Sequence, residues 1–212
     1  MSKTAQLALK LGALALMGWI VATPLFKPDM LCGDDFQWHL SNAIELDRLI
    51  DEGVWYPRWS PDVVFGFGLP NFNFYSPLPR YLTVGIHRLG VPLRDATKMP
   101  AALALMLAGP AMYLLVRSLY GERAGMLAGL AYAFAPYLAD DALQRFAINE
   151  ALAMSLAPLV LWTFGRLAVP SPRLPWTRII WAAVTRGSLV ILPLTEIQSV
   201  PQAQATHLPP AP

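Results

Sequence analysis

The chain has 212 residues, of which 55% are hydrophobic and only 14% are charged, and its mean hydropathy is +0.42. This composition is too apolar for an ordinary soluble domain and indicates a membrane protein. The net charge of +2 and the lack of a Lys/Arg-rich run argue against a nucleic-acid partner. The single cysteine, Cys32, excludes an internal disulfide.

Several stretches are apolar enough to cross the hydrocarbon core, which takes about 20 residues. The sequence predicts an all-α integral membrane protein with about five transmembrane helices. The expected spans are 7–26, 99–116, 125–138, 148–167 and 179–194. The first stretch, with Lys3 and Lys10 on its N-terminal side, could instead be a secretory signal peptide. However, no small-residue cleavage site follows it.

The distribution of basic residues predicts the orientation of these spans. With the N-terminus in the cytoplasm, most arginines between spans lie inside, and the outer break 139–149 carries Arg145 beside Asp140 and Asp141. The segment 76–90 is short and contains Arg80, so we expect it to lie on the outer surface without spanning. We therefore expect a protein of the cytoplasmic (inner) membrane.

This topology divides the chain into four parts. They are a first transmembrane helix (1–26), an extracytoplasmic loop (27–98), further transmembrane helices (99–194) with a short outer loop (139–149), and a disordered tail (195–212).

The long outer loop opens on "LCGDDFQWHLSNAIELDRLIDEG", which has helical spacing. Asp34 or Asp35 suits its N-terminal cap and Gly53 its C-terminal end. One broad apolar face is expected from Phe36, Leu40, Ala43, Ile44 and Ile50.

Beside that face, Asp35, His39 and Asn42 form one polar stripe at i, i+4 and i+7. The stripe is either a solvated face or a functional one.

The aromatic and proline-rich segment that follows, "VWYPRWSPDVVFGFGLPNFNFYSPLPRY", also has two interpretations. Its rings form either a belt at the lipid–water boundary or the wall of a groove for a sugar or a lipid tail. In the second case Trp59 and Tyr75 contact substrate, and Arg58 or Arg80 pairs with a phosphate.

The short outer loop places Asp140, Asp141, Arg145 and Glu150 at the outer mouth of two spans. Ionisable groups at this depth suggest function, although simple interfacial polarity is the alternative. Glu150 could bind a cation, orient a substrate hydroxyl, or only pair with Arg145. A closed zinc site is disfavoured by the ligand set, whereas Mg²⁺ or Mn²⁺ held by Asp34 or Asp35 and a substrate phosphate is chemically reasonable.

Several motifs together resemble the GT-C class of membrane glycosyltransferases. They are Asp35-x-x-x-His39, Gly53-x-x-x-Pro57-x-Trp59, Gly66-x-Gly68-x-Pro70, and the Arg145 to Glu150 element of "RFAINEALA". Within the class, the chain is most similar to bacterial multispanning proteins labelled as related to 6-pyruvoyl-tetrahydropterin synthase, although no motif here supports pterin chemistry. The resemblance covers residues 7–168.

The resemblance implies transfer of a sugar, with inversion, from a polyprenyl-phosphate donor to an acceptor on the outer face. Asp35 would activate the acceptor, with Asp34 as the reserve, and Glu150 would bind a cation or orient substrate. Positive charge for the leaving phosphate would come from Arg58, Arg80, Arg145 or a metal, with Asp35 and Glu150 as the metal ligands. His39 would also lie in the substrate site.

Two features depart from the class: its members usually have more spans, and membrane character is lost from about Val184. A truncated or frame-shifted copy is therefore expected. The competing hypothesis is a non-catalytic membrane protein, such as a transporter subunit or an assembly factor. Transporters carry ionisable groups near mid-span, whereas here the acids gather at the outer ends.

Overall fold

The computed structural model describes residues 2–27 and 33–168, and this part of the chain is helical. No strand forms within these residues; a single antiparallel bridge joins Ser60 and Leu69. The predicted all-α fold is confirmed. The expected span 179–194, the expected tail 195–212 and Cys32 lie outside the described residues.

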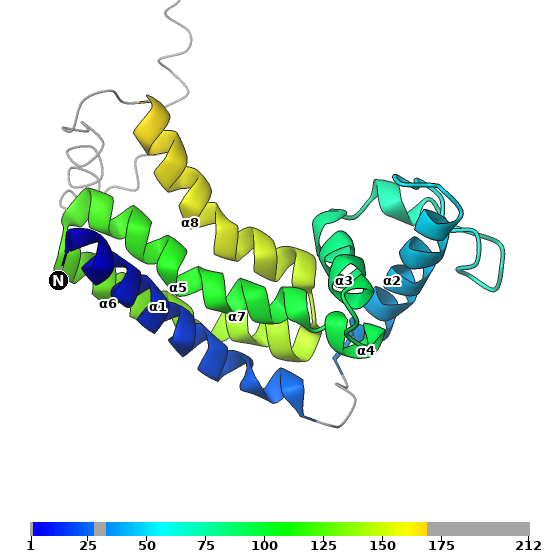
Figure 1. Cartoon of the computed structure of the whole chain (residues 1–212), viewed down its shortest axis with the longest axis horizontal. Helices are drawn as coiled ribbons and strands as arrows, with labels where there is room; N and C mark the ends of the chain where they lie inside the picture. Colours follow the sequence, from blue (N-terminus) through cyan, green and yellow to red (C-terminus); the bar gives the residue numbers. More distant parts are fainter. Residues whose placement is uncertain (1, 28–32, 169–212) are drawn as a thin grey trace, which may run out of the picture. The chain divides into compact units, whose positions relative to one another are not determined.

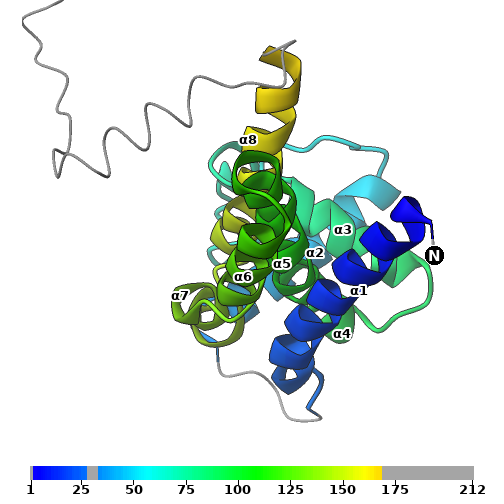
Figure 2. The same cartoon turned by 90° about the vertical axis from the view of Figure 1, so that its left-hand side faces the viewer.

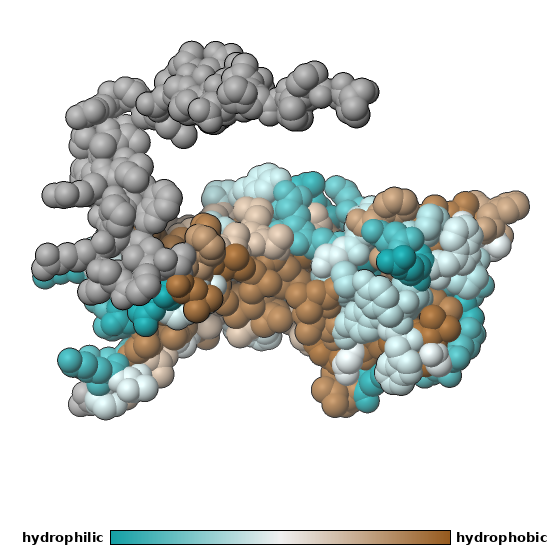
Figure 3. Space-filling model, turned by 90° about the horizontal axis from the view of Figure 1, so that it is seen from above, coloured by the Kyte–Doolittle hydropathy of each residue, from teal (hydrophilic) through white to brown (hydrophobic). Residues whose placement is uncertain are grey.

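Three of the described helices are long and apolar enough to cross a membrane. They are α1 (Lys3–Ala22), continued by η1 (Thr23–Phe26), α5 (Met99–Tyr120) and α8 (Ile148–Ala168). Helix α5 packs against α1, α8 and α6 (Glu122–Ala133), and it lies between α1 and α8 (Figure 1, Figure 2). Hydrophobic side chains dominate the surface over these helices (Figure 3), as lipid contact requires.

The expected span 125–138 is built from two helices. Helix α6 ends at Ala133, and α7 (Pro136–Asp140) begins after a short break. Ala135 is extended, with ψ at 119°, because a residue before proline is pushed out of the helical region. Neither helix alone has the length of a span.

Glycine allows the bundle helices to approach closely. A Cβ on Gly18 of α1 would lie 2.2 Å from the carbonyl oxygen of Leu105 in α5. A Cβ on Gly129 of α6 would lie 3.0 Å from the carbonyl oxygen of Gly109 in α5. Small residues at such contacts are typical of membrane helices, where packing replaces the hydrophobic effect as the source of association.

At the end of the bundle that holds the N-terminus, one carboxylate joins three helices. Glu122 of α6 binds Lys10 of α1 at 2.7 Å and Arg117 of α5 at 2.9 Å. Tyr113 of α5 donates a third hydrogen bond to it, at 2.8 Å. At this end of the bundle, the three helices are therefore held together by ion pairs as well as by packing.

The outer loop folds into α2 (Phe36–Asp51), η2 (Asn71–Asn73), α3 (Leu78–Arg88) and α4 (Leu93–Ala96). Helix α3 has 11 residues, about 16 Å of helix, and it is too short to span, as expected for the segment 76–90. Arg88 fastens α3 to α2 through Asp47 at 2.8 Å and Asp51 at 2.7 Å.

Helix α2 ends as predicted, and its predicted apolar face is buried or half-buried except at Ile44. Gly53, with φ at 87°, receives the end of the helix and donates its N–H to the carbonyl of Ile50. Ile44, expected in the apolar face, is 53% exposed, whereas Glu45 is 4% exposed. The Glu45 carboxylate accepts the backbone N–H of Asp62, which rotates the buried face toward the loop that follows α2.

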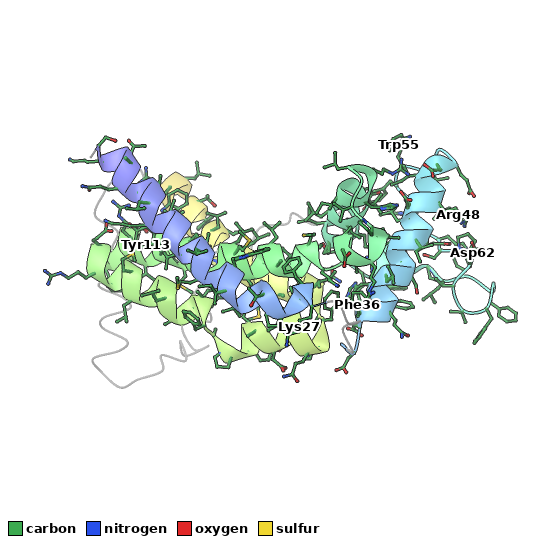
Figure 4. The ribbon with its side chains drawn as sticks, turned by 60° about the horizontal axis from the view of Figure 1, so that its bottom comes forward. Lys27, Phe36, Arg48, Trp55, Asp62 and Tyr113 are labelled. Atoms are coloured by element: carbon green, nitrogen blue, oxygen red, sulfur yellow. The ribbon has the colours of Figure 1, made fainter. Side chains whose placement is uncertain are left out.

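The loop after α2 is also held by an ion pair. Arg48 of α2 binds the carboxylate of Asp62 at 3.1 Å, and the two side chains face each other in Figure 4. This pair and the Ser60–Leu69 bridge fix the base of the turn 60–69. The turn carries Phe65 at full exposure.

Candidate functional site

The two outer loops meet where α2 begins. The backbone N–H groups of Asp34 and Asp35 donate to the carbonyl oxygens of Gln144 and Arg145, each over 3.1 Å. Gly33 lies against the same segment, since a Cβ there would be 3.0 Å from the Gln144 carbonyl oxygen. The fold thus joins the two segments that carry the predicted site residues.

Phe146 packs against the start of α2 at this junction. The residue is fully buried, and its backbone has the left-handed helical conformation, with φ at 57°. Its ring packs edge-on against Phe36, with 5.0 Å between centroids, and lies 6.1 Å from the ring of His39. The π-helix η3 (Asp141–Arg145) immediately precedes it, and such turns are frequent at functional sites.

Asp35 occupies the N-cap position of α2, but its side chain makes no capping hydrogen bond. Its backbone, with φ at −102° and ψ at 3°, is not in the extended conformation usual for a cap. The side chains of Asp34 and Asp35 are both exposed, and neither has a hydrogen bond or ion pair among the described residues. The expected capping role is wrong, and the Asp35 carboxylate is open to a ligand.

In the second loop, four side chains form one hydrogen-bonded cluster, which we call the Arg145 cluster. Arg145 binds Asp141 and lies 3.5 Å from Glu150. Tyr137 donates to Glu150 at 2.8 Å and accepts from Arg145 at 3.3 Å. Two carboxylates therefore share one guanidinium, and the cluster holds Glu150 beside the junction of the loops.

The structure distinguishes Asp141 from the other ionisable groups that the sequence places in the second loop. It is fully buried, and its second carboxylate oxygen has no partner among the described residues. Burial raises its pKa, the neighbouring Glu150 raises it further, and Arg145 opposes both. The sequence displayed Asp140 and Asp141 as equivalent neighbours, and only the π-helix decides which one faces inward.

The polar stripe of α2 is not a solvated face. His39 is 3% exposed and Asn42 is fully buried. Asn42 donates to the Trp38 carbonyl at 2.7 Å and accepts a hydrogen bond from Asn71. Burial, helped by the charge of Arg80, lowers the pKa of His39 to about 4, while a hydrogen bond to the Phe146 backbone acts against them. The imidazole is therefore neutral at pH 7.

The remaining predicted residues divide by burial. Arg58 is exposed and has no ion pair in the described part of the chain, whereas Arg80 is buried. Trp59 is half-exposed and lies against Gly68, where a Cβ would be 2.5 Å from the indole nitrogen. Tyr75 is half-exposed, and its ring lies against Arg80.

Within the described residues, no three His, Cys, Asp or Glu side chains gather as a metal site. The open carboxylates of Asp34 and Asp35 are hard oxygen donors of the kind that Mg²⁺ or Mn²⁺ prefers. Such an ion would need ligands from a substrate phosphate to complete its shell.

The helices and the paired loops define an integral membrane protein in which the predicted site residues lie beyond one end of the spans. The family model of dolichyl-phosphate-mannose-protein mannosyltransferases, which are of the GT-C type, matches residues 75–191, more than half of the chain. The chain belongs to this family. Searches of curated proteins and of solved structures gave no match.

The matched range contains the Arg145 cluster and Arg80 but not the start of α2. The narrower resemblance to the proteins labelled as related to 6-pyruvoyl-tetrahydropterin synthase stays a prediction.

Proposed function

We propose that the chain is a GT-C-type glycosyltransferase, or part of one, that moves a sugar from a polyprenyl-phosphate donor to an acceptor on the outer face of the cytoplasmic membrane. One observation carries the proposal above the others. The backbone N–H of Asp35, whose carboxylate is open, donates to the Arg145 carbonyl in the loop that presents Glu150. A base and a second acid thus come from two loops to one junction.

In this reaction Asp35 takes the proton of the acceptor hydroxyl. The acceptor oxygen forms its bond to the anomeric carbon on the face opposite the phosphate, and the bond from that carbon to the phosphate oxygen breaks. The phosphate leaves with the electron pair, and the configuration inverts. A positioned base contributes about 10²- to 10⁴-fold to such a step. Asp34, open and adjacent, is the reserve base.

Glu150 orients substrate, or with Asp35 it would hold a Mg²⁺ or Mn²⁺ ion that would supply positive charge for the leaving phosphate. Arg145 is a positioning residue for Glu150, since its charge is already shared by two carboxylates. The positive charge that the leaving phosphate requires must then come from Arg58, Arg80 or the metal. His39, Trp59 and Tyr75 line the donor site.

The test is sugar transfer from polyprenyl-phosphate mannose, the type of donor that the family name specifies, by the full chain in detergent or vesicles. We expect Asp35→Asn to lower turnover at least about 100-fold and Glu150→Gln to lower it less. Asp62→Asn, an exposed acid bound to Arg48, is the matched control. Unchanged turnover in both test variants would remove the assigned roles, and a folded chain without transfer would favour a non-catalytic membrane protein.

The proposal also requires both loops to face the outside, with the N-terminus in the cytoplasm. Single cysteines at the exposed positions Ser41 and Gln144, after replacement of Cys32, should react with an impermeant thiol reagent added to intact cells. A cysteine at Arg123, near the other end of the bundle, should react only after lysis. Protection of Ser41 or Gln144 would reverse the topology.

A further inference from the structure

Arg80 is a buried cation that has no acidic partner among residues 2–27 and 33–168. The residue is 2% exposed, and its Nε and Nη2 atoms have no hydrogen-bond acceptor among the described residues. Only Nη1 is used, in a hydrogen bond to the Ser76 carbonyl at 3.3 Å. Burial lowers the pKa of Arg80, the neighbouring Tyr75 acts in the opposite direction, and no carboxylate of the described residues offsets the effect of burial. A guanidinium stays protonated even so, and an uncompensated buried charge is costly to a fold.

Two aromatic rings enclose this guanidinium. Its carbon lies 5.7 Å from the centre of the Phe72 ring and 5.2 Å from the centre of the Tyr75 ring. Phe72 is buried in a cluster with α2 and α3, whereas Tyr75 is 44% exposed. The Phe72 ring is therefore fixed by packing on one side of the guanidinium, whereas the Tyr75 ring separates the guanidinium from solvent on the other side.

Other unsatisfied groups lie on the same side of α2. Trp38 has a buried indole N–H without a partner in the described chain, and its ring lies 6.4 Å from that of Tyr75. His39 has a buried Nδ1 without a partner, and the charge of Arg80 acts on this imidazole. Buried polar groups are almost always satisfied in a native protein, so a cluster of exceptions indicates a missing ligand.

We propose that Arg80 is a closed anion site, in which the phosphate of the lipid-linked donor displaces the Tyr75 ring and accepts hydrogen bonds from the guanidinium. The inference rests on the proposed function for the identity of the donor. A phosphate matches the planar fork of arginine with two parallel hydrogen bonds and supplies the negative charge that this pocket lacks. Helix α3, which carries Arg80, packs against α5, so the pocket is joined to a membrane helix.

The Tyr75 ring and the phosphate compete for one face of the guanidinium, which gives a test by gain of affinity. Farnesyl phosphate, a short isoprenyl phosphate without a sugar, is titrated into the detergent-solubilised full chain by calorimetry. Tyr75→Ala should bind it about fivefold more tightly, the factor equivalent to about 1 kcal/mol, as expected for removal of one cation–π contact. A gain of affinity cannot result from misfolding.

Arg80→Met should abolish this binding, and Arg80→Lys should weaken it at least about tenfold, because an ammonium lacks the planar fork. Arg123→Met is the control, an exposed arginine at the other end of the bundle. In the wild-type chain, binding of farnesyl phosphate should change the tryptophan fluorescence, since the Trp38 indole lies against Tyr75. This fluorescence change should be absent in Trp38→Phe.

Three outcomes would overturn the proposal. They are wild-type affinity in both Arg80 variants, weaker binding in Tyr75→Ala, and competition by inorganic phosphate or by phosphatidylglycerol vesicles as effective as that by farnesyl phosphate. The competition experiments distinguish binding of an isoprenyl phosphate from binding of a free anion and from binding of bulk lipid. Because no sugar is transferred, binding without turnover would refute the proposed function alone, and turnover without dependence on Arg80 would refute this inference alone.

Discussion

Arg80 and Arg145 are two arginines of the outer loops with opposite surroundings. Arg145 is half-exposed and lies between two carboxylates, one of them the buried Asp141. Arg80 is buried, and its neighbours are aromatic rings and a neutral histidine. Both were predicted as partners of a phosphate.

The difference shows which arginine has charge available. In the Arg145 cluster the guanidinium stabilises acids of its own chain, so an incoming phosphate would meet two negative groups. Around Arg80 no acid of the described chain offsets the charge, so an anion would gain the full interaction. A buried pair and a buried lone charge therefore predict opposite effects of mutation.

The largest effect is expected from removing each arginine in turn. Arg145→Met should lower the free energy of unfolding, because it leaves the buried Asp141 carboxylate without its cationic partner. Arg80→Met should leave stability unchanged or raise it, because a buried charge disappears. The measurement is an SDS titration of the detergent-solubilised chain. Adding Asp141→Asn to Arg145→Met should restore much of the lost stability. Equal losses of stability in Arg145→Met and Arg80→Met would contradict the difference between the two arginines.

A smaller effect concerns pH and the neighbour of Arg80. Burial lowers the pKa of His39 from 6.5 to about 4, so between these values the unfolded chain binds a proton that the folded chain does not. Stability should fall as pH drops from 6.5 toward 4, by up to about 3 kcal/mol at the lower limit. His39→Gln should flatten this dependence in thermal unfolding, whereas His87→Gln should retain it. The opposite pattern would mean that His39 is charged in the fold.

The smallest effect should come from the contact between the loops. Gly33→Ala places a Cβ 3.0 Å from both the Gln144 carbonyl oxygen and the Phe146 side chain, which should cost about 1 to 2 kcal/mol by overpacking. Sugar transfer should fall with it if the junction aligns Asp35 with Glu150. Gly85→Ala in α3 has open space around the new methyl group and should be neutral or stabilising. Normal sugar transfer by Gly33→Ala would show that the contact between the two loops is not needed for activity.

Sequence patterns were sufficient for the helices that face lipid. Long apolar runs predicted α1, α5 and α8, since in a bilayer the length and polarity of a segment decide whether it can span. Gly53 predicted the end of α2 for a similarly local reason. The break before Pro136 was also readable from the sequence but was not anticipated within the expected span 125–138.

The predictions that failed in the outer loop depended on long-range contacts. The capping role of Asp35 was wrong because its backbone is held by carbonyls of the second loop. The sequence left open whether His39 and Asn42 form a solvated face, and their burial excludes that alternative. Asp141 was not distinguished from its neighbour because only the π-helix turns it inward.

The sequence by itself determined that this is an α-helical membrane protein, because the length and polarity of each segment decide separately whether it can cross a bilayer. Only the tertiary structure decided which acids are open and which arginine lacks a counter-charge. These properties depend on what packs against each side chain from distant parts of the chain, and no local pattern encodes them.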